Sequence, residues 1–76
     1  MIKNHYLVLK VCPFEPKEIN KFLKDRNIGN VVLRAGVKPE DYWKVRNEVE
    51  KGLEGNKTVH LFVKGRTAIL CEVIFN

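Results

Sequence analysis

The residues that could do chemistry in this chain are few, and what is missing excludes most catalytic arrangements. The sequence contains no serine, so a Ser–His–Asp nucleophile is excluded. Its two cysteines, Cys12 and Cys71, form no CxxC pair, and only His5 and His60 could join them around a metal, at spacings that metal sites do not use. We therefore expect two buried apolar thiols and no metal, with a disulfide as the less favoured alternative.

One pair of residues could act as nucleophile and base. If the last two strands are joined by a two-residue turn, His60 lies opposite Cys71 on the neighbouring strand. No third group is placed to orient the histidine, and a packed cysteine beside a half-exposed histidine is the commoner arrangement. Asp25 is explained by a helical pair with Lys21, and Asp41 by the first turn of a helix. We therefore predict that the protein is not an enzyme and uses no cofactor.

Basic residues carry the more informative chemistry. Fourteen Lys and Arg against nine Asp and Glu give a net charge of +5, which favours polyanions. A bend with Arg34 and Lys38 precedes a helix N-terminus, whose free N–H groups attract phosphate, although Glu40 and Asp41 oppose this attraction. A second group of cations lies on the tip of a hairpin, where charged residues are also ordinary solvated turn residues. The tip consists of Lys64, Gly65 and Arg66.

The outer face of the sheet is the third candidate. Interleaved aromatic and basic residues on an open sheet suit base stacking combined with phosphate contact. The predicted nucleic-acid contacts are Tyr6 for stacking and Lys10, Arg34, Lys38, Lys64 and Arg66 for phosphate, with His60 and Phe62 on the same face if the turn has two residues. Val8 and Val32 share this face, so a dimer or domain interface is the alternative interpretation.

Hydrophobic periodicity predicts the elements that position these groups. The expected order is β-α-β-α-β-β, with strands over residues 5–11, 30–35, 57–64 and 67–75, and helices over residues 16–26 and from residue 39 to about Gly52. We predict a single α+β domain over residues 1–76. It is a two-layer sandwich in which a four-stranded mixed sheet has both helices on one face. Its first two strands are parallel through a right-handed crossover.

Two details of packing follow from the alternation of side chains. In the first strand it places Leu7, Leu9 and Val11 on one face and Tyr6, Val8 and Lys10 on the other. In the last two strands, a two-residue turn aligns Val59, Leu61 and Val63 with Ala68, Leu70 and Ile74, and a longer turn aligns them with Ile69, Cys71, Val73 and Phe75. Both registers are apolar, so the sequence leaves this choice open. Trp43 lies at the edge of its helix stripe and is expected to pack against the sheet margin rather than to anchor a partner.

Composition suggests where the protein works. No apolar run approaches the roughly 20 residues of a membrane span, and the first residues do not resemble a signal peptide, so we expect a cytoplasmic protein. Abundant Lys and Glu with no glutamine and a single methionine are typical of hyperthermophile proteins. We therefore expect an archaeal-like thermophile protein, although the seven asparagines weaken this inference.

Part of the chain resembles a known family. Phe22-Leu23, Asn27-Ile28-Gly29, a Val/Leu strand ending in Arg34, Gly36-Val37 and Pro39-Glu40 resemble the THUMP-like C-terminal module of some SAM-dependent methyltransferases, and Gly65 to Cys71 resembles that module's closing strand. The likeness covers residues 19–71, and it implies RNA capture or docking on an enzyme. The methyltransferase domain is missing, the stretch between Gly36 and Pro39 is shorter, and Ala35 replaces one basic residue, which weakens a phosphate contact there.

A second likeness is to Alba-type archaeal nucleic-acid-binding proteins. They share the β-α-β-α-β-β order and a second strand that ends in a basic residue and glycine, but their hairpin arm is longer. Both likenesses imply the same class of partner. We therefore predict a non-catalytic module that binds RNA, tRNA-like or otherwise, or another nucleic acid, and that could serve a separate modification enzyme such as a methyltransferase. The alternative is a protein-interaction module that dimerises or docks through its open sheet face.

Overall fold

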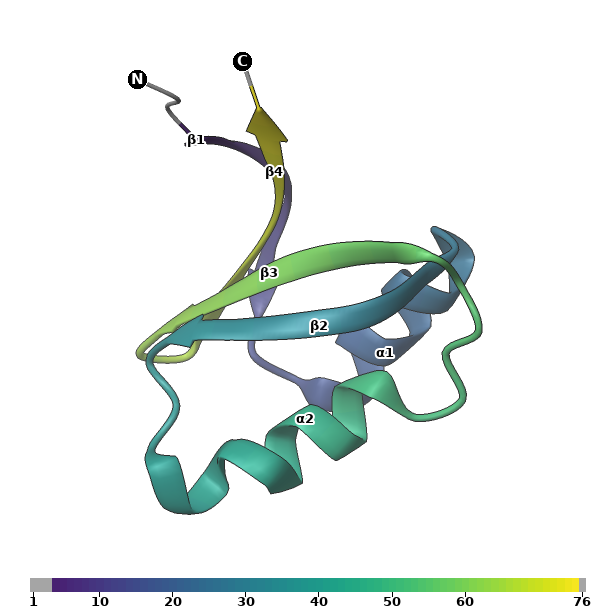
Figure 1. Cartoon of the computed structure of the whole chain (residues 1–76). Helices are drawn as coiled ribbons and strands as arrows, with labels where there is room; N and C mark the ends of the chain where they lie inside the picture. The colour runs from purple at the N-terminus through teal and green to yellow at the C-terminus, as the bar shows by residue number, and fades with distance from the viewer. Residues whose placement is uncertain (1–3, 76) are drawn as a thin grey trace.

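The computed structural model describes residues 4–75 and has the predicted α+β architecture. The elements are β1 (Asn4–Pro13), α1 (Pro16–Asp25), β2 (Ile28–Ala35), the 3₁₀ turn η1 (Pro39–Asp41), α2 (Tyr42–Glu50), β3 (Lys57–Lys64) and β4 (Thr67–Phe75). The strands form one mixed sheet in the order β1-β4-β3-β2. Both helices cover the same side of this sheet (Figure 1), which confirms the two-layer prediction.

The core lies between the sheet and the helices. Its members are Ile19, Leu23, Ile28, Val31, Val49, Val59, Leu61, Val63, Ala68 and Leu70. The apolar stripes of α1 and α2 supply the helical part, because residues three or four apart share one face of a helix. We call the opposite side of the sheet, which no helix covers, the open face.

The order of the strands separates the first two by the width of the sheet. β2 and β3 are adjacent and parallel, joined through α2, whereas β4 is antiparallel to both of its neighbours, β3 and β1. β1 and β2 therefore run in the same direction, as predicted, but they form the two edges of the sheet. The predicted crossover through α1 thus spans the two strands between them.

The β3–β4 hairpin has the two-residue turn. Lys64 pairs with Thr67, and between them Gly65 has a φ of 61°, a left-handed conformation that glycine adopts without strain. His60 is consequently the partner of Cys71, and Leu61 is the partner of Leu70. The register that the sequence left open is therefore the one that places His60 and Phe62 on the open face.

A β-bulge in β1 overturns part of the predicted alternation. Val8 pairs with Cys71 but Lys10 pairs with Leu70, so Leu9 is an extra residue that shifts the register. Lys10 therefore lies on the helix side, with its ammonium 5.0 Å from the centre of the Phe22 ring. The prediction that Lys10 shares a face with Tyr6 is wrong, and so is the prediction that Val11 shares one with Leu9.

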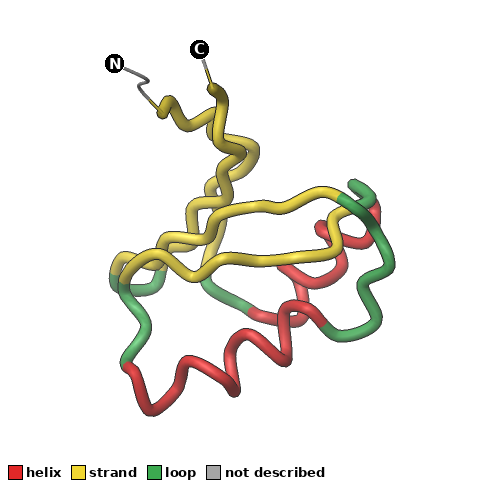
Figure 2. Tube along the Cα trace, viewed as in Figure 1, coloured by secondary structure: helices red, strands yellow, loops and turns green. Residues whose placement is uncertain are grey.

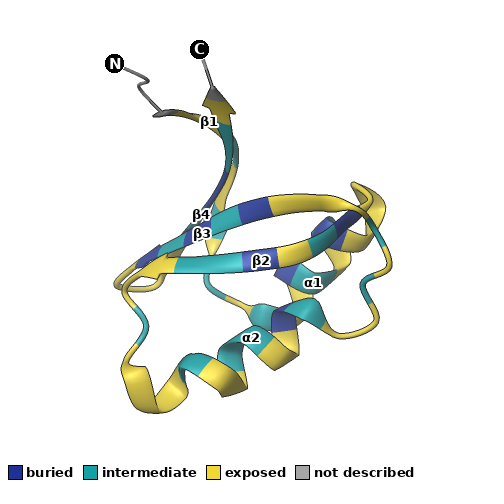
Figure 3. Cartoon of the chain, viewed as in Figure 1, coloured by how far each residue is buried: buried dark blue, intermediate teal, exposed yellow. Residues whose placement is uncertain are grey.

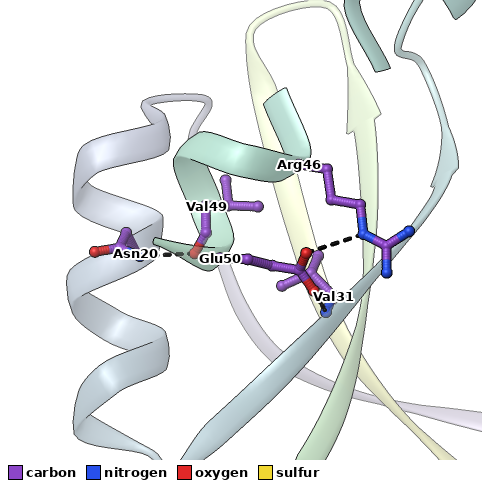
Figure 4. Close-up of polar contacts among 5 residues, drawn as sticks. All are labelled: Asn20, Val31, Arg46, Val49 and Glu50. Carbon is purple, nitrogen blue, oxygen red and sulfur yellow. Dashed lines mark hydrogen bonds and ion pairs between the residues drawn. The ribbon is translucent and has the colours of Figure 1, made fainter. Parts of the chain in front are cut away.

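Two polar side chains link neighbouring elements: Asn20 links α1 to α2, and Glu50 links α2 to β2 (Figure 4). The Asn20 amide of α1 donates to the carbonyl oxygen of Val49 at 2.8 Å. It also donates to the carbonyl oxygen of Lys51 at 2.9 Å, so both carbonyls at the end of α2 are satisfied. Glu50 accepts from the backbone N–H of Val31 and from Arg46 Nε, each at 2.9 Å. Since Val31 belongs to the edge strand β2, the Glu50 carboxylate protects that edge.

The end of α1 and the position of Trp43 on α2 are two further features of the helices. Asn27, with a φ of 58°, supplies the left-handed stop after α1. Trp43 is 66% exposed and does not pack against the sheet margin. It contacts Tyr42 edge-to-face at 5.3 Å between ring centres, with the Arg46 guanidinium 5.7 Å from its ring.

The outer part of the β1–β4 pair, from residue 4 to residue 8 on β1 and from residue 72 to residue 75 on β4, bends away from the helices, and we call it the arm (Figure 1). Its surface is largely exposed, whereas the buried segments lie where the sheet meets the helices (Figure 3). Because the arm bends toward the open-face side, that face is concave. Within residues 4–75, no helix has the length and apolar character needed to cross a bilayer.

Candidate nucleic-acid interface

Four side chains from three strands meet on the open face. The Tyr6 ring contacts His60 and Phe62 edge-to-face, with ring centres 5.8 Å and 5.4 Å apart. The Arg34 guanidinium donates a hydrogen bond of 2.9 Å to the Tyr6 phenol oxygen. We call Tyr6, Arg34, His60 and Phe62 the aromatic cluster. It joins two of the predicted contacts to the histidine and phenylalanine that the two-residue turn places beside them.

The curvature of the sheet makes this cluster possible. In a flat sheet, edge strands separated by two others would lie about 14 Å apart, at about 4.8 Å per strand spacing. Tyr6 on β1 nevertheless touches Arg34 on β2, because the arm brings β1 over the open face. A bulge at Arg34 itself, between the pairs Leu33–Leu61 and Ala35–Phe62, places the arginine in this ladder as an extra residue.

The surroundings of the cluster disfavour the charged form of its histidine. The pKa of His60 lies below its ordinary value, first because burial disfavours the imidazolium and second because Arg34 repels it. His60 Nδ1 is buried without a hydrogen-bond partner in the described structure. Its neighbour Cys71 is 3% exposed, and burial raises the pKa of its thiol. Burial therefore disfavours the thiolate form that a Cys–His nucleophile would need.

Acidic residues are segregated away from the open face. All nine lie within residues 4–75, and eight of them belong to the helical layer and its connections. These eight are Glu15, Glu18, Asp25, Glu40, Asp41, Glu48, Glu50 and Glu54. The ninth, Glu72, pairs with Leu7 one position beyond Cys71, so alternation directs it to the helix side. Among the residues that the structure describes, the open face therefore carries no Asp or Glu side chain.

Predicted cations gather at one end of the sheet. The β2–η1 bend and the β3–β4 turn lie at the same end (Figure 2), and a Cβ on Gly36 would collide with the carbonyl of Val63. Lys64 alternates onto the open face, and Arg66 forms the turn. This arrangement brings the bend and the hairpin tip, two of the three predicted cation groups, beside the third.

Lys38 differs from the other cations at this end because acidic side chains lie near it. It lines a cavity of about 410 Å³ between the bend and α2. The lining residues are Phe14, Gly36, Val37, Lys38, Asp41, Lys44, Val45 and Glu48. Two carboxylates offset two ammonium groups there, so this cavity is not specialised for phosphate.

The remaining candidates lie apart. Lys10 is on the helix side beside Phe22, so it is not one of the cations on the open face. Cys12 pairs with Ala68 of the core and Cys71 pairs with His60 on the open face, so the two free thiols are on opposite sides of the sheet and the disulfide alternative is wrong. No three metal-ligating side chains come together among the described residues.

One feature that the sequence reasoning missed is the position of β1 at an edge. Pro13 is its signal: the strand continues to Pro13, which pairs with Thr67, and proline within a strand is confined to edges because it cannot donate to a ladder. The contact between Tyr6 and Arg34 has no such signal, because it depends on the bend of the arm.

Comparison with known proteins gives no further guidance. No protein-family model, curated protein or solved structure matches this chain. The two resemblances described above therefore stay predictions.

Proposed function

We propose that the protein is a non-catalytic module that binds single-stranded RNA or a similar nucleic acid on its open face. The observation that carries the proposal is the aromatic cluster on a concave face without carboxylates. Exposed bases stack on aromatic rings, and a strand's phosphates follow nearby cations. Arg34 lies inside the cluster, and Lys64 and Arg66 lie at the end of the sheet beside it.

Single strands fit this surface better than a duplex. The aromatic rings of the cluster lie on a sheet rather than on a projecting helix, and a paired base would not expose its face to them. Tyr6 is 40% exposed, so part of its ring is available to a base without rearrangement. The Tyr6 ring is therefore the predicted stacking platform, and Arg34, Lys64 and Arg66 are the predicted phosphate contacts.

The test is a titration of fluorescent oligonucleotides, single-stranded and duplex, over a salt series. We expect single-stranded RNA to bind more tightly, with affinity falling steeply as salt rises. Arg34→Glu should weaken binding by about tenfold or more and reduce the salt slope by about one. The matched control is Lys17→Glu, the same charge change at an exposed position of α1, which should have a much smaller effect.

Two results would count against this function. One is the absence of binding at low salt. The other is equal weakening by Arg34→Glu and Lys17→Glu, since a diffuse charge effect needs no particular face.

A protein-binding role of the open face is the second candidate. Val8 is 54% exposed and Val11 is 60% exposed, and both lie on this face. Exposed apolar groups favour a protein partner over a polyanion. Failure of every oligonucleotide to bind, together with an association that Val11→Lys abolishes, would favour this candidate.

A further inference from the structure

The two edges of the sheet are protected very differently. At β2, the Glu50 carboxylate accepts the outward N–H of Val31. At β1, within residues 4–75, ladder pairing is with β4 alone, so its other edge is free over a ten-residue strand. An unpaired edge of this length is a template for another strand.

The free edge also lacks the charges that usually prevent pairing. Residues 4–9 contain no charged side chain, and Lys10 comes only after the bulge at Leu9. Leu7 is 48% exposed and Val8 is 54% exposed, and they lie on opposite faces of the arm. Natural edge strands are commonly blunted by lysine, proline or a bulge. In β1 these devices begin at Leu9 and leave the preceding segment open.

Symmetry favours a second copy as the partner. Each chain carries +5, but the Lys, Arg, Asp and Glu residues lie outside residues 4–9, so pairing through this segment places none of these charges directly opposite one another. Antiparallel pairing about a two-fold axis places residues 4–8 of one copy against the same residues of the other, an isologous contact that satisfies both edges at once. The segment is already a strand in each copy, so pairing orders little new backbone.

The area needed indicates how much of the arm takes part. A standard interface covers about 800 Å² per partner, roughly one-seventh of the 5559 Å² surface of this molecule. The five residues 4–8 at about 3.4 Å each, on an edge about 10 Å deep, offer only about 170 Å². Exposed apolar side chains on both faces of the arm must therefore be covered as well. Leu7 and Ile74 on one face and Tyr6 and Val8 on the other are the groups available.

We propose that two copies of the chain pair antiparallel through their β1 edges and form one continuous eight-stranded sheet. Because such a two-fold axis is perpendicular to the sheet, both open faces lie on the same side of the assembly. Two aromatic clusters then flank the junction. The pairing itself does not depend on what the open face binds.

The test is sedimentation velocity over a concentration series, with Leu7→Lys as the disrupting variant. Leu7 is on the face opposite the aromatic cluster, so this change separates dimerisation from nucleic-acid binding. We expect a dimer of the natural chain, and we expect Leu7→Lys to raise its dissociation constant at least tenfold because it brings like charges together. Trp43→Lys is the matched control, since Trp43 is a more exposed apolar residue on α2, and it should leave the dimer intact.

Hydrogen exchange provides a second readout that does not depend on any variant. The amides of residues 4–8 on the outer edge should become more protected as chain concentration rises, while those of β2 should not change. A monomer at millimolar concentration would overturn the proposal, as would dissociation by Trp43→Lys with no effect of Leu7→Lys. Concentration-independent exchange at β1 in a dimeric sample would also overturn it, since the contact would then lie elsewhere.

Discussion

The Arg34 guanidinium donates a 2.9 Å hydrogen bond to the phenol oxygen of Tyr6, although the two residues belong to opposite edges of a four-stranded sheet. This bond can form only because the arm bends over the open face. It also holds an arginine against a tyrosine that contacts two further rings. Pre-positioned groups bind a partner with less loss of side-chain freedom than mobile ones.

Substitutions at Tyr6 separate its ring from its hydroxyl. Tyr6→Ala removes the stacking platform and should weaken binding of single-stranded RNA by about 1–3 kcal/mol, roughly 5- to 150-fold. Tyr6→Phe keeps the ring and frees Arg34, so it should change affinity only about twofold to threefold. Fluorescence anisotropy measures both. Equal losses in the two variants would show that the hydroxyl, and not the ring, contributes the binding.

The contrast between β1 and the β3–β4 hairpin explains how much of this site could be predicted. Alternation in β3 and β4, with a Gly-Arg pair between them, was sufficient to place His60 and Phe62 on one face once the turn length was known. Alternation in β1 failed after Leu9, because apolar residues at positions 7, 8, 9 and 11 fit either register and no glycine marks the bulge. Lys10 was therefore assigned to the wrong face. The meeting of Tyr6 and Arg34 depends on sheet curvature, which local patterns do not encode.

Protection of the β2 edge should contribute measurably to stability. Glu50→Ala leaves the N–H of Val31 without its side-chain acceptor, which should lower the free energy of unfolding by about 1–3 kcal/mol. Glu48→Ala, on the same helix but exposed, is the control and should change it by less than about 0.5 kcal/mol. Glu50→Gln retains an acceptor oxygen and should fall between them. Urea denaturation measures all three, and similar values for Glu50→Ala and Glu48→Ala would contradict this role.

Gly36 and Gly65 form a matched pair for testing the bend. Both have positive φ, of 86° and 61°, but a Cβ on Gly36 would collide with the Val63 carbonyl, whereas one on Gly65 meets open space. Gly65→Ala should therefore cost only the left-handed strain, about 1–2 kcal/mol. Gly36→Ala should cost clearly more, because the β2–η1 bend must also move away from β3. Thermal unfolding compares them, and equal costs would mean that the bend yields without resistance.

His60 predicts how stability depends on pH. Its pKa is lowered in the folded state, first by burial and then by Arg34, while an unfolded histidine titrates near about 6.5. Between that pH and the lower folded value, the unfolded chain binds more protons than the folded one. The free energy of unfolding should therefore be highest above about pH 6.5, fall as the pH drops below it, and level off below the folded pKa.

The measurement for His60 is urea denaturation between about pH 5 and pH 8, a range in which unperturbed carboxylates stay largely ionised. His60→Gln should flatten the dependence, and the decrease should persist in His5→Gln, a change at the chain's other histidine, outside the aromatic cluster. Arg34→Gln should reduce the decrease without abolishing it, since burial is the larger cause of the shift. A free energy of unfolding that rises on acidification through this range would contradict the prediction. It would show that the surroundings of His60 favour the imidazolium cation instead of disfavouring it.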